Sequence, residues 1–226
     1  VVVPKEVLRD QGVTDMNQAM THVSGVQPVM GGGYGFANNF VIRGQAMRFL
    51  RDGYFDGTAQ NGYWRTFADV DRIEVLKGPG SALYGAGQPG GTINAVTKTP
   101  RRNTAAELST TLGSFGTLNG TADITGALSA NLAGRLIVNT EKTDGWRDLS
   151  RDIKEILPTL TWWVNDSSTL TVDYDHRELK VTPDNYGLPF DVRRTIVSAP
   201  STTQYYSPLN YSDQTIDRLT LSHEWL

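Results

Sequence analysis

The stretch Asp71–Thr97 reads DRIEVLKGPGSALYGAGQPGGTINAVT, and it carries the strongest structural signal in the sequence. Two strand-like runs, Arg72–Lys77 and Thr92–Thr97, enclose a segment rich in glycine and proline. Glycine lets a backbone turn tightly and pass close to its neighbours, and it weakens the interior of a helix or strand. The stretch therefore predicts two strands joined by a compact connection built from turns.

The connection contains Gly85-Ala86-Gly87-Gln88-Pro89-Gly90, a literal match to the G-x-G-x-x-G motif of dinucleotide-binding proteins. That motif works where it joins a strand to a helix, because the pyrophosphate then rests on the N-terminus of the helix. Here the strand-like run Thr92–Thr97 follows, so the context disfavours nucleotide binding. A P-loop is excluded because no Gly-Lys-Ser/Thr follows at the required spacing. A soluble nucleotide-binding enzyme remains the weaker alternative.

Upstream of this stretch the sequence predicts two short helices. Pro4 suits the first position of a helix, and Gly12 suits its end. Thr14 or Asp15 can cap a second helix, in which apolar residues fall at i, i+3, i+4 and i+7. These apolar residues are Met16, Ala19, Met20 and Val23.

Between these helices and the stretch Asp71–Thr97, the sequence predicts glycine-containing loops and turns that alternate with short strands. Gly31–Gly35 predicts a loop, because consecutive glycines are costly in helices and strands. Strand-like runs follow at Phe40–Arg43 and Arg48–Arg51. Asp52-Gly53 and Asp56-Gly57 predict turns.

After Pro100 apolar and polar residues alternate with period two, which predicts strands with one apolar face. We count about six strands of roughly ten residues, the length that a tilted strand needs to cross a bilayer. They lie around Leu108–Leu112, Leu118–Thr125, Leu132–Val138, Leu160–Asn165, Leu170–Asp175 and Arg218–Trp225.

The connections between these strands differ in length. Those at Ser114–Gly116, Gly126–Ala130 and Asn165–Ser168 are short, whereas Lys142–Glu155 and Glu178–Gln214 are long. Short turns on one side and long loops on the other are typical of outer-membrane barrels. A soluble antiparallel sandwich with long loops shows the same alternation of residues, so the pattern alone leaves both architectures open.

Composition narrows the class of protein. The 226 residues include 21 Lys and Arg against 24 Asp and Glu, a formal net charge of −3, so nothing indicates a nucleic-acid surface. No apolar run approaches the roughly 20 residues of a transmembrane helix. The absence of cysteine excludes disulfides, thiolate metal sites and cysteine nucleophiles. No signal peptide is visible, which fits a trimmed chain or a cytosolic one.

Several linked motifs resemble the plug domain of TonB-dependent outer-membrane receptors. In order, they are the corner Val23–Val26, the run Val41–Gly44, the strand Arg72–Val75, the corner Lys77–Pro79, the turn Leu83–Gly85 and the double glycine with its strand, Gly90–Asn94.

The resemblance implies a fold. Residues 1–100 are expected to form an α+β plug domain, a small mixed sheet with short helices. Residues 101–226 are expected to supply the first antiparallel strands of a transmembrane β-barrel of about 22 strands. Because the chain supplies about six of them, we expect it to be part of a longer receptor. The TonB box is not visible.

The resemblance also implies a function without covalent chemistry. It points to a receptor in the outer membrane of a Gram-negative bacterium that binds a ferric siderophore and imports it into the periplasm, and not to an enzyme. The implied partners are the TonB protein with its inner-membrane energising complex and outer-membrane lipid or lipopolysaccharide, without nucleic acid. Iron enters only within the bound chelate, and no cofactor is expected. Receptors for vitamin B12, haem and carbohydrate share the signature, and a structural or adhesive protein is a further alternative.

Ligand contacts are carried over by position, because siderophores rest on plug loops beneath barrel loops in this family. Aromatic rings offer stacking and guanidinium groups offer charge to flat or anionic chelates. Packing between plug and barrel explains any single aromatic equally well. The loop apices that carry tyrosine, tryptophan and arginine, together with Gly187-Leu188-Pro189, resemble those of ferric hydroxamate or mixed-type siderophore receptors. The candidates are Tyr34, Phe36, Gln45, Met47, Arg48, Tyr63 and Trp64 in the plug, and Tyr186, Phe190, Tyr205, Tyr206 and Tyr211 in the long connection.

Arg43 and Arg72 resemble the family's arginines that lock the plug to glutamates of the barrel. Their partners are expected on strands beyond Leu226, and ordinary surface ion pairs are the alternative. Removing one member of such a buried pair leaves an uncompensated charge.

Enzyme chemistry has weak support in the sequence. His22, His176 and His223 are scattered without metal-ligand spacing, so no metal site is expected. The aspartate pairs Asp52/Asp56 and Asp69/Asp71 are more commonly turn or ion-pair residues. No serine lies in a G-x-S-x-G context.

Overall fold

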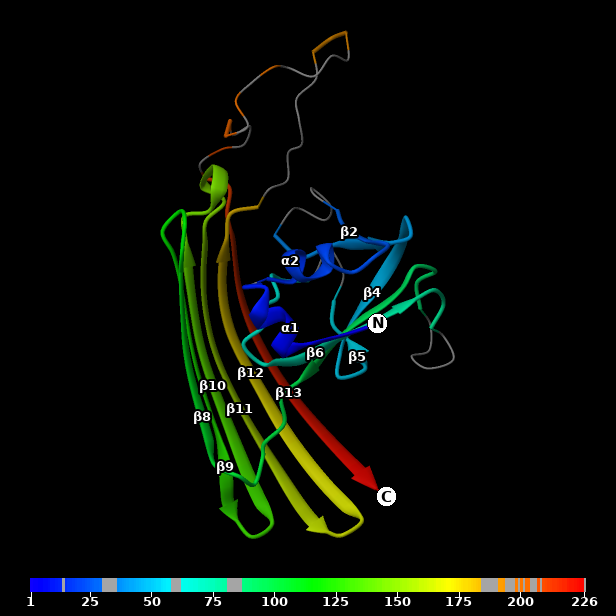
Figure 1. The fold of residues 1–226 in the computed structure, drawn as a ribbon, viewed down its shortest axis with the longest axis vertical. Coiled ribbons are helices and arrows are strands. Elements are labelled where there is room, and N and C mark those ends of the chain that lie inside the picture. The colour runs from blue at the N-terminus through cyan, green and yellow to red at the C-terminus, as the bar shows by residue number, and fades with distance from the viewer. Residues whose placement is uncertain are drawn as a thin grey trace. The chain divides into compact units, whose positions relative to one another are not determined.

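The computed structural model describes residues 1–13, 15–29, 36–57, 62–80, 87–183, 191–193, 198, 200, 202–203, 207 and 209–225. The described residues form two compact units, one built on Val1–Lys98 and the other on Thr99–Thr182 with Tyr211–Leu226. The first unit holds a seven-stranded sheet with two short helices, and the second holds a six-stranded sheet (Figure 1).

Both predicted helices of the first unit are confirmed. Helix α1, Lys5–Asp10, begins after Pro4, and the N–H of Gly12 bonds the carbonyl of Arg9 at 2.9 Å just past its end. Helix α2, Met16–Thr21, is capped by Asp15, whose carboxylate accepts the N–H of Gln18 at 3.0 Å. The cap satisfies a backbone donor that the helix itself leaves open.

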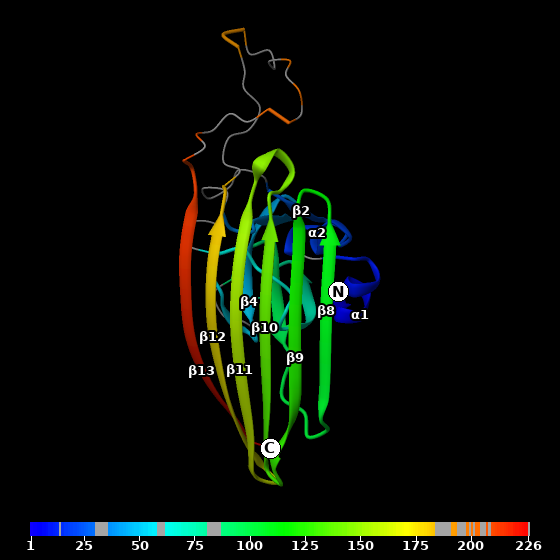
Figure 2. The same ribbon diagram turned by 90° about the vertical axis from the view of Figure 1, so that its left-hand side faces the viewer.

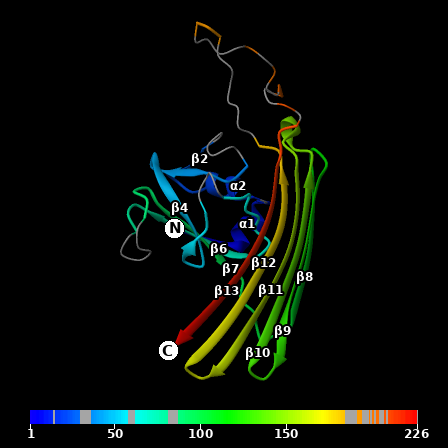
Figure 3. The same cartoon turned by 180° about the vertical axis from the view of Figure 1, so that it is seen from behind.

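The sheet of the first unit is mixed. Strands β4 and β7 run parallel, whereas β6 and β7 are antiparallel neighbours that lie side by side in Figure 3. The order across the sheet is β1-β6-β7-β4-β3-β2, and β5 pairs with β4. The strands are β1 Val2–Pro4, β2 Val26–Pro28, β3 Phe40–Ile42, β4 Gln45–Arg51, β5 Tyr54–Phe55, β6 Val70–Lys77 and β7 Gly91–Thr97. A small mixed sheet with short helices is the α+β architecture that the sequence predicted.

The double glycine before β7 is a packing device. A Cβ atom added to Gly91, whose φ is +125°, would lie 1.9 Å from the carbonyl oxygen of Leu76 on β6. One added to Gly90 would lie 2.6 Å from the carbonyl oxygen of Ala46 on β4. The backbone can therefore pass between β6 and β4 only without side chains here. Because a strand and not a helix follows, the G-x-G-x-x-G match lacks the context that nucleotide binding requires.

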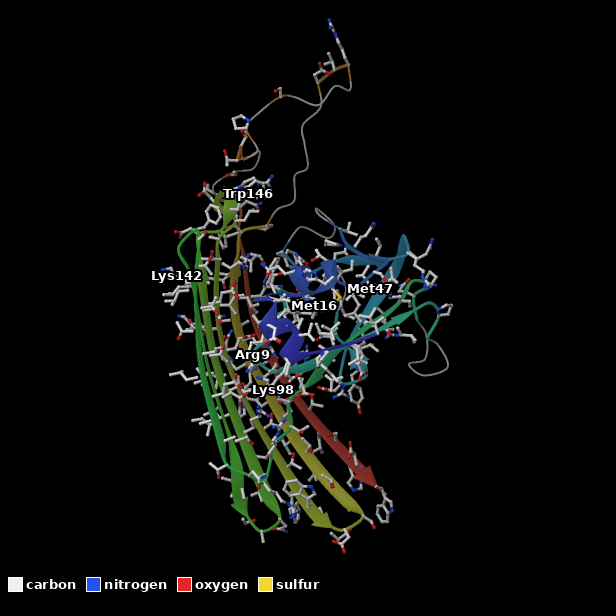
Figure 4. All side chains as sticks on the ribbon, in the orientation of Figure 1. Arg9, Met16, Met47, Lys98, Lys142 and Trp146 are labelled. Atoms are coloured by element: carbon white, nitrogen blue, oxygen red, sulfur yellow. The ribbon has the colours of Figure 1, made fainter. Side chains whose placement is uncertain are left out.

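Helix α2 and the sheet share one apolar core. The predicted stripe is buried, with Met16 and Met20 at 0% exposure, and Met47 of β4 packs against the same cluster (Met16 and Met47 are labelled in Figure 4). The other members come from the sheet and α1, namely Leu8, Val26, Phe40, Ile42, Phe49, Val70, Ile73, Val75, Ile93 and Ala95. Helices α1 and α2 thus pack against the seven-stranded sheet through this apolar core.

Two turns set the boundaries of β3, β4 and β5, one at the predicted position and one at a position that the sequence did not predict. Asp52-Gly53 joins β4 to β5 with φ values of +50° and +83°, as predicted. Arg43-Gly44 forms a second turn of this kind, with φ values of +52° and +75°. Strand β3 therefore ends at Ile42 and β4 begins at Gln45, three residues before the predicted start. Arginine rarely adopts positive φ, so the sequence carries no local signal for this turn.

Asp56 belongs to the second predicted turn, where Gly57 has a φ of +84°, and it has buried partners that the sequence did not reveal. Its side chain is 3% exposed and receives hydrogen bonds from Tyr63 and Arg65. A dipeptide pattern does not reveal such partners, because they lie several residues away along the chain.

Six antiparallel strands make up the second unit, and they pair in chain order (Figure 2). They are β8 Ala105–Gly113, β9 Thr117–Ser129, β10 Leu132–Thr143, β11 Arg151–Asn165, β12 Ser168–Val181 and β13 Ser212–Trp225. The predicted number is confirmed, but β9 and β11 extend further into the predicted connections. Lys154 and Glu155 belong to β11, where they are in register with Thr140 and Asn139. The sequence pattern missed them because charged residues occupy both faces of the strand near that end.

The exposed face of the six-stranded sheet carries large apolar residues, whereas the opposite face buries charged residues among apolar ones such as Ile137, Ile153 and Leu179. Leu136, Ile156 and Leu219 are 44%, 49% and 72% exposed. On the opposite face Glu155 and Arg177 are each 1% exposed. A soluble sandwich buries its apolar face, so this polarity contradicts the sandwich alternative and matches a lipid-facing sheet.

No helix among the described residues is long and apolar enough to cross a membrane.

Candidate functional site

The β3–β4 hairpin carries four predicted site residues. Arg43 is exposed at its turn and makes no ion pair within the described residues. Gln45 is exposed, whereas Met47 is half-buried against the core. The hairpin thus presents a cationic tip beside a polar side chain, and Met47 is held by packing.

Arg48 lies over an exposed aromatic ring. Its guanidinium carbon is 4.7 Å from the centroid of Phe55 on β5, and Phe55 and the neighbouring Tyr54 are 51% and 64% exposed. A cation over a ring at this distance is a favourable pair. The predicted Arg48 therefore belongs to a surface group that combines charge with aromatic area.

Tyr63 is buried, and its neighbour Trp64 is half-buried. The hydroxyl of Tyr63 donates to Asp56 Oδ2 at 3.1 Å, and Arg65 Nε donates to the same oxygen at 2.9 Å. Phe36 is half-buried. The structure therefore ties Tyr63 into an ion pair that the sequence analysis did not identify.

Arg72 on β6 has local carboxylate partners. Its Nε donates to Glu74 Oε1 at 2.9 Å, its Nη1 lies 3.4 Å from Asp71 Oδ2, and its side chain is 41% exposed. The hydrogen bond that Arg72 donates to Glu74 raises the pKa of Arg72, so the guanidinium stays charged. Asn94 Nδ2 donates to the other oxygen of Glu74 at 3.2 Å, which links β6 to β7.

Several predicted ligand residues lie outside the described residues. They are Tyr34, Tyr186, Phe190, Tyr205 and Tyr206, and Gly187-Leu188-Pro189 lies outside as well. Tyr211, just before β13, is described and is 72% exposed.

A second buried ion pair of the first unit was also missed. Arg51 at the end of β4 pairs with Asp69, and their side chains are 9% and 6% exposed. The carbonyl of Asp69 accepts the N–H of Lys98 at 2.8 Å, while Lys98 Nζ donates to the carbonyl of Ala68 at 2.7 Å. Asp69 is therefore an ion-pair residue, one of the two roles that the sequence favoured for it, although the sequence did not identify Arg51 as the partner.

A polar network crosses the buried face of the six-stranded sheet. Asn139 Nδ2 donates to Glu155 Oε2 at 2.8 Å, and Arg177 Nη1 donates to Glu155 Oε1 at 2.5 Å. Arg177 and Arg218 both approach Asp175, at 3.5 and 3.7 Å. Nearer the short turns, Arg135 donates to both oxygens of Asp123 at 2.8 and 2.6 Å. Opposite charges thus neutralise one another on this face.

Within the described ranges, no group of three or more histidine or acidic side chains is arranged to hold a metal ion. The geometry offers stacking, charge and hydrogen bonding, which serve binding.

Comparison with known proteins places the first unit in a family. Residues 1–92 match the family model described as the TonB-dependent Receptor Plug Domain. This range contains the helices, the first six strands and the double glycine.

Relatives extend the similarity beyond the plug. The chain is 32% identical over 198 residues to the "Probable TonB-dependent receptor BfrD" of Bordetella pertussis, covering 85% of this chain and 26% of that protein. It is 29% identical over 246 residues to the "Catecholate siderophore receptor Fiu" of Escherichia coli K12, covering 99% and 31%. It is 34% identical over 177 residues to the "Metal-pseudopaline receptor CntO" of Pseudomonas aeruginosa PAO1, covering 76% and 25%.

The fold agrees with a solved structure. The closed form of the ferric-catecholate import receptor Fiu from E. coli K12 aligns with a TM-score of 0.85 at 26% identity, over 98% of this chain and 33% of that chain. The chain thus spans about a third or less of the length of the proteins that it matches.

Proposed function

We propose that the chain, whose residues 1–92 belong to the TonB-dependent receptor plug family, is part of an outer-membrane receptor for ferric siderophores, as several of its relatives are named. The receptor binds the chelate at its extracellular face and imports it into the periplasm, with energy that the TonB protein and its inner-membrane complex supply. No covalent step is involved.

The inverted polarity of the six-stranded sheet carries this proposal. A plug-type sheet is followed by strands that expose large apolar side chains on one face and bury paired charged side chains on the other. Water-soluble sheets show the reverse arrangement, whereas lipid-facing strands need it. The outward apolar residues suit the outer membrane of a Gram-negative bacterium, where lipid or lipopolysaccharide contacts them.

The names of the relatives support a metal chelate as the ligand. Fiu is named for catecholate siderophores, CntO for metal-pseudopaline, and a Yersinia enterocolitica relative at 30% identity is a ferrioxamine receptor. These ligands are metal chelates of different chemistry. We infer a ferric siderophore as the class and assign no single member.

The ligand contacts that we propose are those predicted above, except Tyr63, which is buried. Among the described candidates, Arg48 offers charge beside the exposed ring of Phe55, and Trp64 offers an indole at the start of an irregular segment. Rings and guanidinium groups suit flat or anionic chelates. We further propose that Arg43 and Arg72 lock the plug to carboxylates of the complete barrel.

A binding experiment on the full-length receptor in detergent tests the function. Intrinsic tryptophan fluorescence is titrated with ferrioxamine and with the iron(III) complex of 2,3-dihydroxybenzoate, and haem and vitamin B12 serve as comparators. We expect saturable quenching by at least one ferric chelate, and a smaller signal in a Trp64→Phe variant. Quenching by haem or vitamin B12 alone would reassign the ligand.

A growth experiment separates transport from binding. Cells with and without the gene grow on the recognised ferric chelate as sole iron source. Growth that depends on both the gene and an intact TonB system is expected. Binding without such growth would support a structural or adhesive protein.

A further inference from the structure

A buried cluster holds the backbone beside two candidate ligand residues, Phe36 and Trp64. Asn38, Asp56, Tyr63 and Arg65, here called the Asp56–Arg65 cluster, are 1%, 3%, 5% and 3% exposed. They come from three separate stretches of the first unit. None of the four belongs to a helix or a strand.

Arg65 is the centre of the cluster. Its Nε donates to Asp56 Oδ2 at 2.9 Å, its Nη2 donates to the backbone carbonyl of Asp56, and its Nη1 donates to the carbonyl of Tyr63 at 3.2 Å. The guanidinium carbon lies 3.9 Å from the ring centroid of Phe49 on β4 and 4.6 Å from that of Tyr63. A planar guanidinium makes forked and stacked contacts together, which an ammonium group cannot reproduce.

Asn38 extends the cluster to a helix. Its Oδ1 accepts the backbone N–H of Arg65 at 2.7 Å, and its Nδ2 donates to Asn17 Oδ1 on α2 at 3.2 Å. A backbone N–H can only donate, which fixes the orientation of the Asn38 amide. The cluster therefore links α2, Asn38 and the segment around Arg65 through directional bonds.

The position of the cluster gives it a specific role. Buried backbone groups outside helices and strands need other hydrogen-bond partners, and here side chains supply them. Asn38 lies two residues after Phe36, while Trp64 lies between the cluster members Tyr63 and Arg65. The hydrogen bonds that hold Asn38 and Arg65 therefore also restrict the backbone positions of the two candidate aromatic residues, Phe36 and Trp64.

We propose that Asn38, Asp56 and Arg65 are positioning residues of the ferric-siderophore site, and that Tyr63 serves in the same cluster and not as a ligand contact. The inference rests on the proposed function, because it concerns how that site is held. The cluster preorganises Phe36 and Trp64, so less conformational freedom is lost when the chelate binds.

A purely stabilising role is the competing explanation. Buried ion pairs are on average no more stabilising than apolar residues of the same shape, although removing one partner is costly. A gain in stability therefore does not by itself explain why the Asp56–Arg65 pair is also linked by hydrogen bonds to Asn38 and, through Asn38, to α2. The Arg51–Asp69 pair provides a matched control, because it is similarly buried in the same unit and lies on β4 and before β6.

The test compares four variants of the full-length receptor in detergent: Arg65→Met, Asn38→Ala, Asn17→Ala and the control Arg51→Met. Each is assayed for its unfolding midpoint and for its affinity for ferrioxamine and the iron(III) complex of 2,3-dihydroxybenzoate by tryptophan quenching. Asn38→Ala leaves the Asp56–Arg65 ion pair in place, so it keeps the test valid if Arg65→Met does not fold.

We expect Arg65→Met and Arg51→Met to lower the unfolding midpoint alike. Only Arg65→Met and Asn38→Ala should weaken binding, by about tenfold or more, which is the scale of one well-placed interaction. Asn17→Ala keeps the bond to Arg65 and should stay within about threefold of the wild type. Equal weakening by Arg51→Met, or unchanged affinity in Arg65→Met and Asn38→Ala, overturns the inference. A wild-type receptor that binds neither chelate instead overturns the proposed function.

Discussion

Arg177 on β12 and Glu155 on β11 form an ion pair 2.5 Å long, and their side chains are 1% and 0% exposed. The two residues face each other in register across antiparallel strands. Glu155 also accepts the amide of Asn139 at 2.8 Å, so both of its oxygens are hydrogen-bonded. The pair therefore compensates two charges whose side chains are almost fully buried.

The first prediction follows from this compensation. Arg177→Met leaves the carboxylate of Glu155 buried without this cation and should destabilise the full-length receptor by about 3–5 kcal/mol. Adding Glu155→Gln removes the charge of Glu155 and keeps an acceptor for Asn139, while Arg218 still lies 3.7 Å from the nearby Asp175, so the double variant should recover much of the loss. Urea unfolding in detergent measures both values.

An exposed ion pair is the control for this prediction. Lys180 and Asp213 lie 3.6 Å apart with side chains 67% and 51% exposed. Lys180→Met should change stability by no more than about 1 kcal/mol. If the Arg177→Met single variant proves as stable as the double variant, the buried charge is not the cause of the loss.

A second prediction concerns the double glycine. Gly91→Ala places a methyl group 1.9 Å from the Leu76 carbonyl oxygen at a φ of +125°, so it should prevent the first unit from folding correctly. Gly44→Ala is matched in having positive φ, +75°, but meets nothing within 4 Å. It should cost only about 1–2 kcal/mol. Limited proteolysis of the purified receptor distinguishes the two, and equal protease resistance would contradict the packing role of Gly91.

The third prediction tests the outward apolar face. Leu136 and Thr140 lie four residues apart on β10 and point to the same exposed face. Leu136→Arg should impair insertion into the outer membrane, because an arginine near the bilayer midplane costs about 2–4 kcal/mol. Thr140→Arg lies beside Lys154 in register, nearer the polar end, and should insert normally. The heat-dependent migration of membrane fractions on gels reports the folded barrel, and equal amounts of both variants would argue against a lipid-facing Leu136.

Local patterns in the sequence were sufficient to predict most of the strands and one of the turns. Period-two alternation revealed the strands, and Asp52-Gly53 revealed a turn, because both signals lie within a few neighbouring residues. The alternation did not reveal which face is buried, since that depends on the surroundings of the sheet. The Arg43-Gly44 turn was missed because arginine gives no sign of positive φ.

The site was less predictable than the fold. Arg65 and Asp56 lie nine residues apart, and Asn38 is 27 residues from Arg65. Their hydrogen bonds form only after the chain has folded, so neither the sequence spacing nor the residue types predict these bonds. Tyr63 was identified as an aromatic candidate, but the sequence did not show that its hydroxyl is engaged by Asp56.

The final prediction separates the two proposed locking arginines. Arg72 already has Glu74 and Asp71 as partners, whereas Arg43 makes no ion pair within the described residues. Arg43→Asn removes the charge and keeps a residue that tolerates positive φ, so the hairpin should survive. In the complete receptor this variant should loosen the plug by about 2 kcal/mol or more. Arg72→Gln should have a smaller effect, because a barrel carboxylate is only one of several partners. Sensitivity of cells to vancomycin, an antibiotic too large for a plugged barrel, measures the loosening. A larger effect of Arg72→Gln, or wild-type resistance in both variants, would refute the assignment of Arg43 as the principal lock.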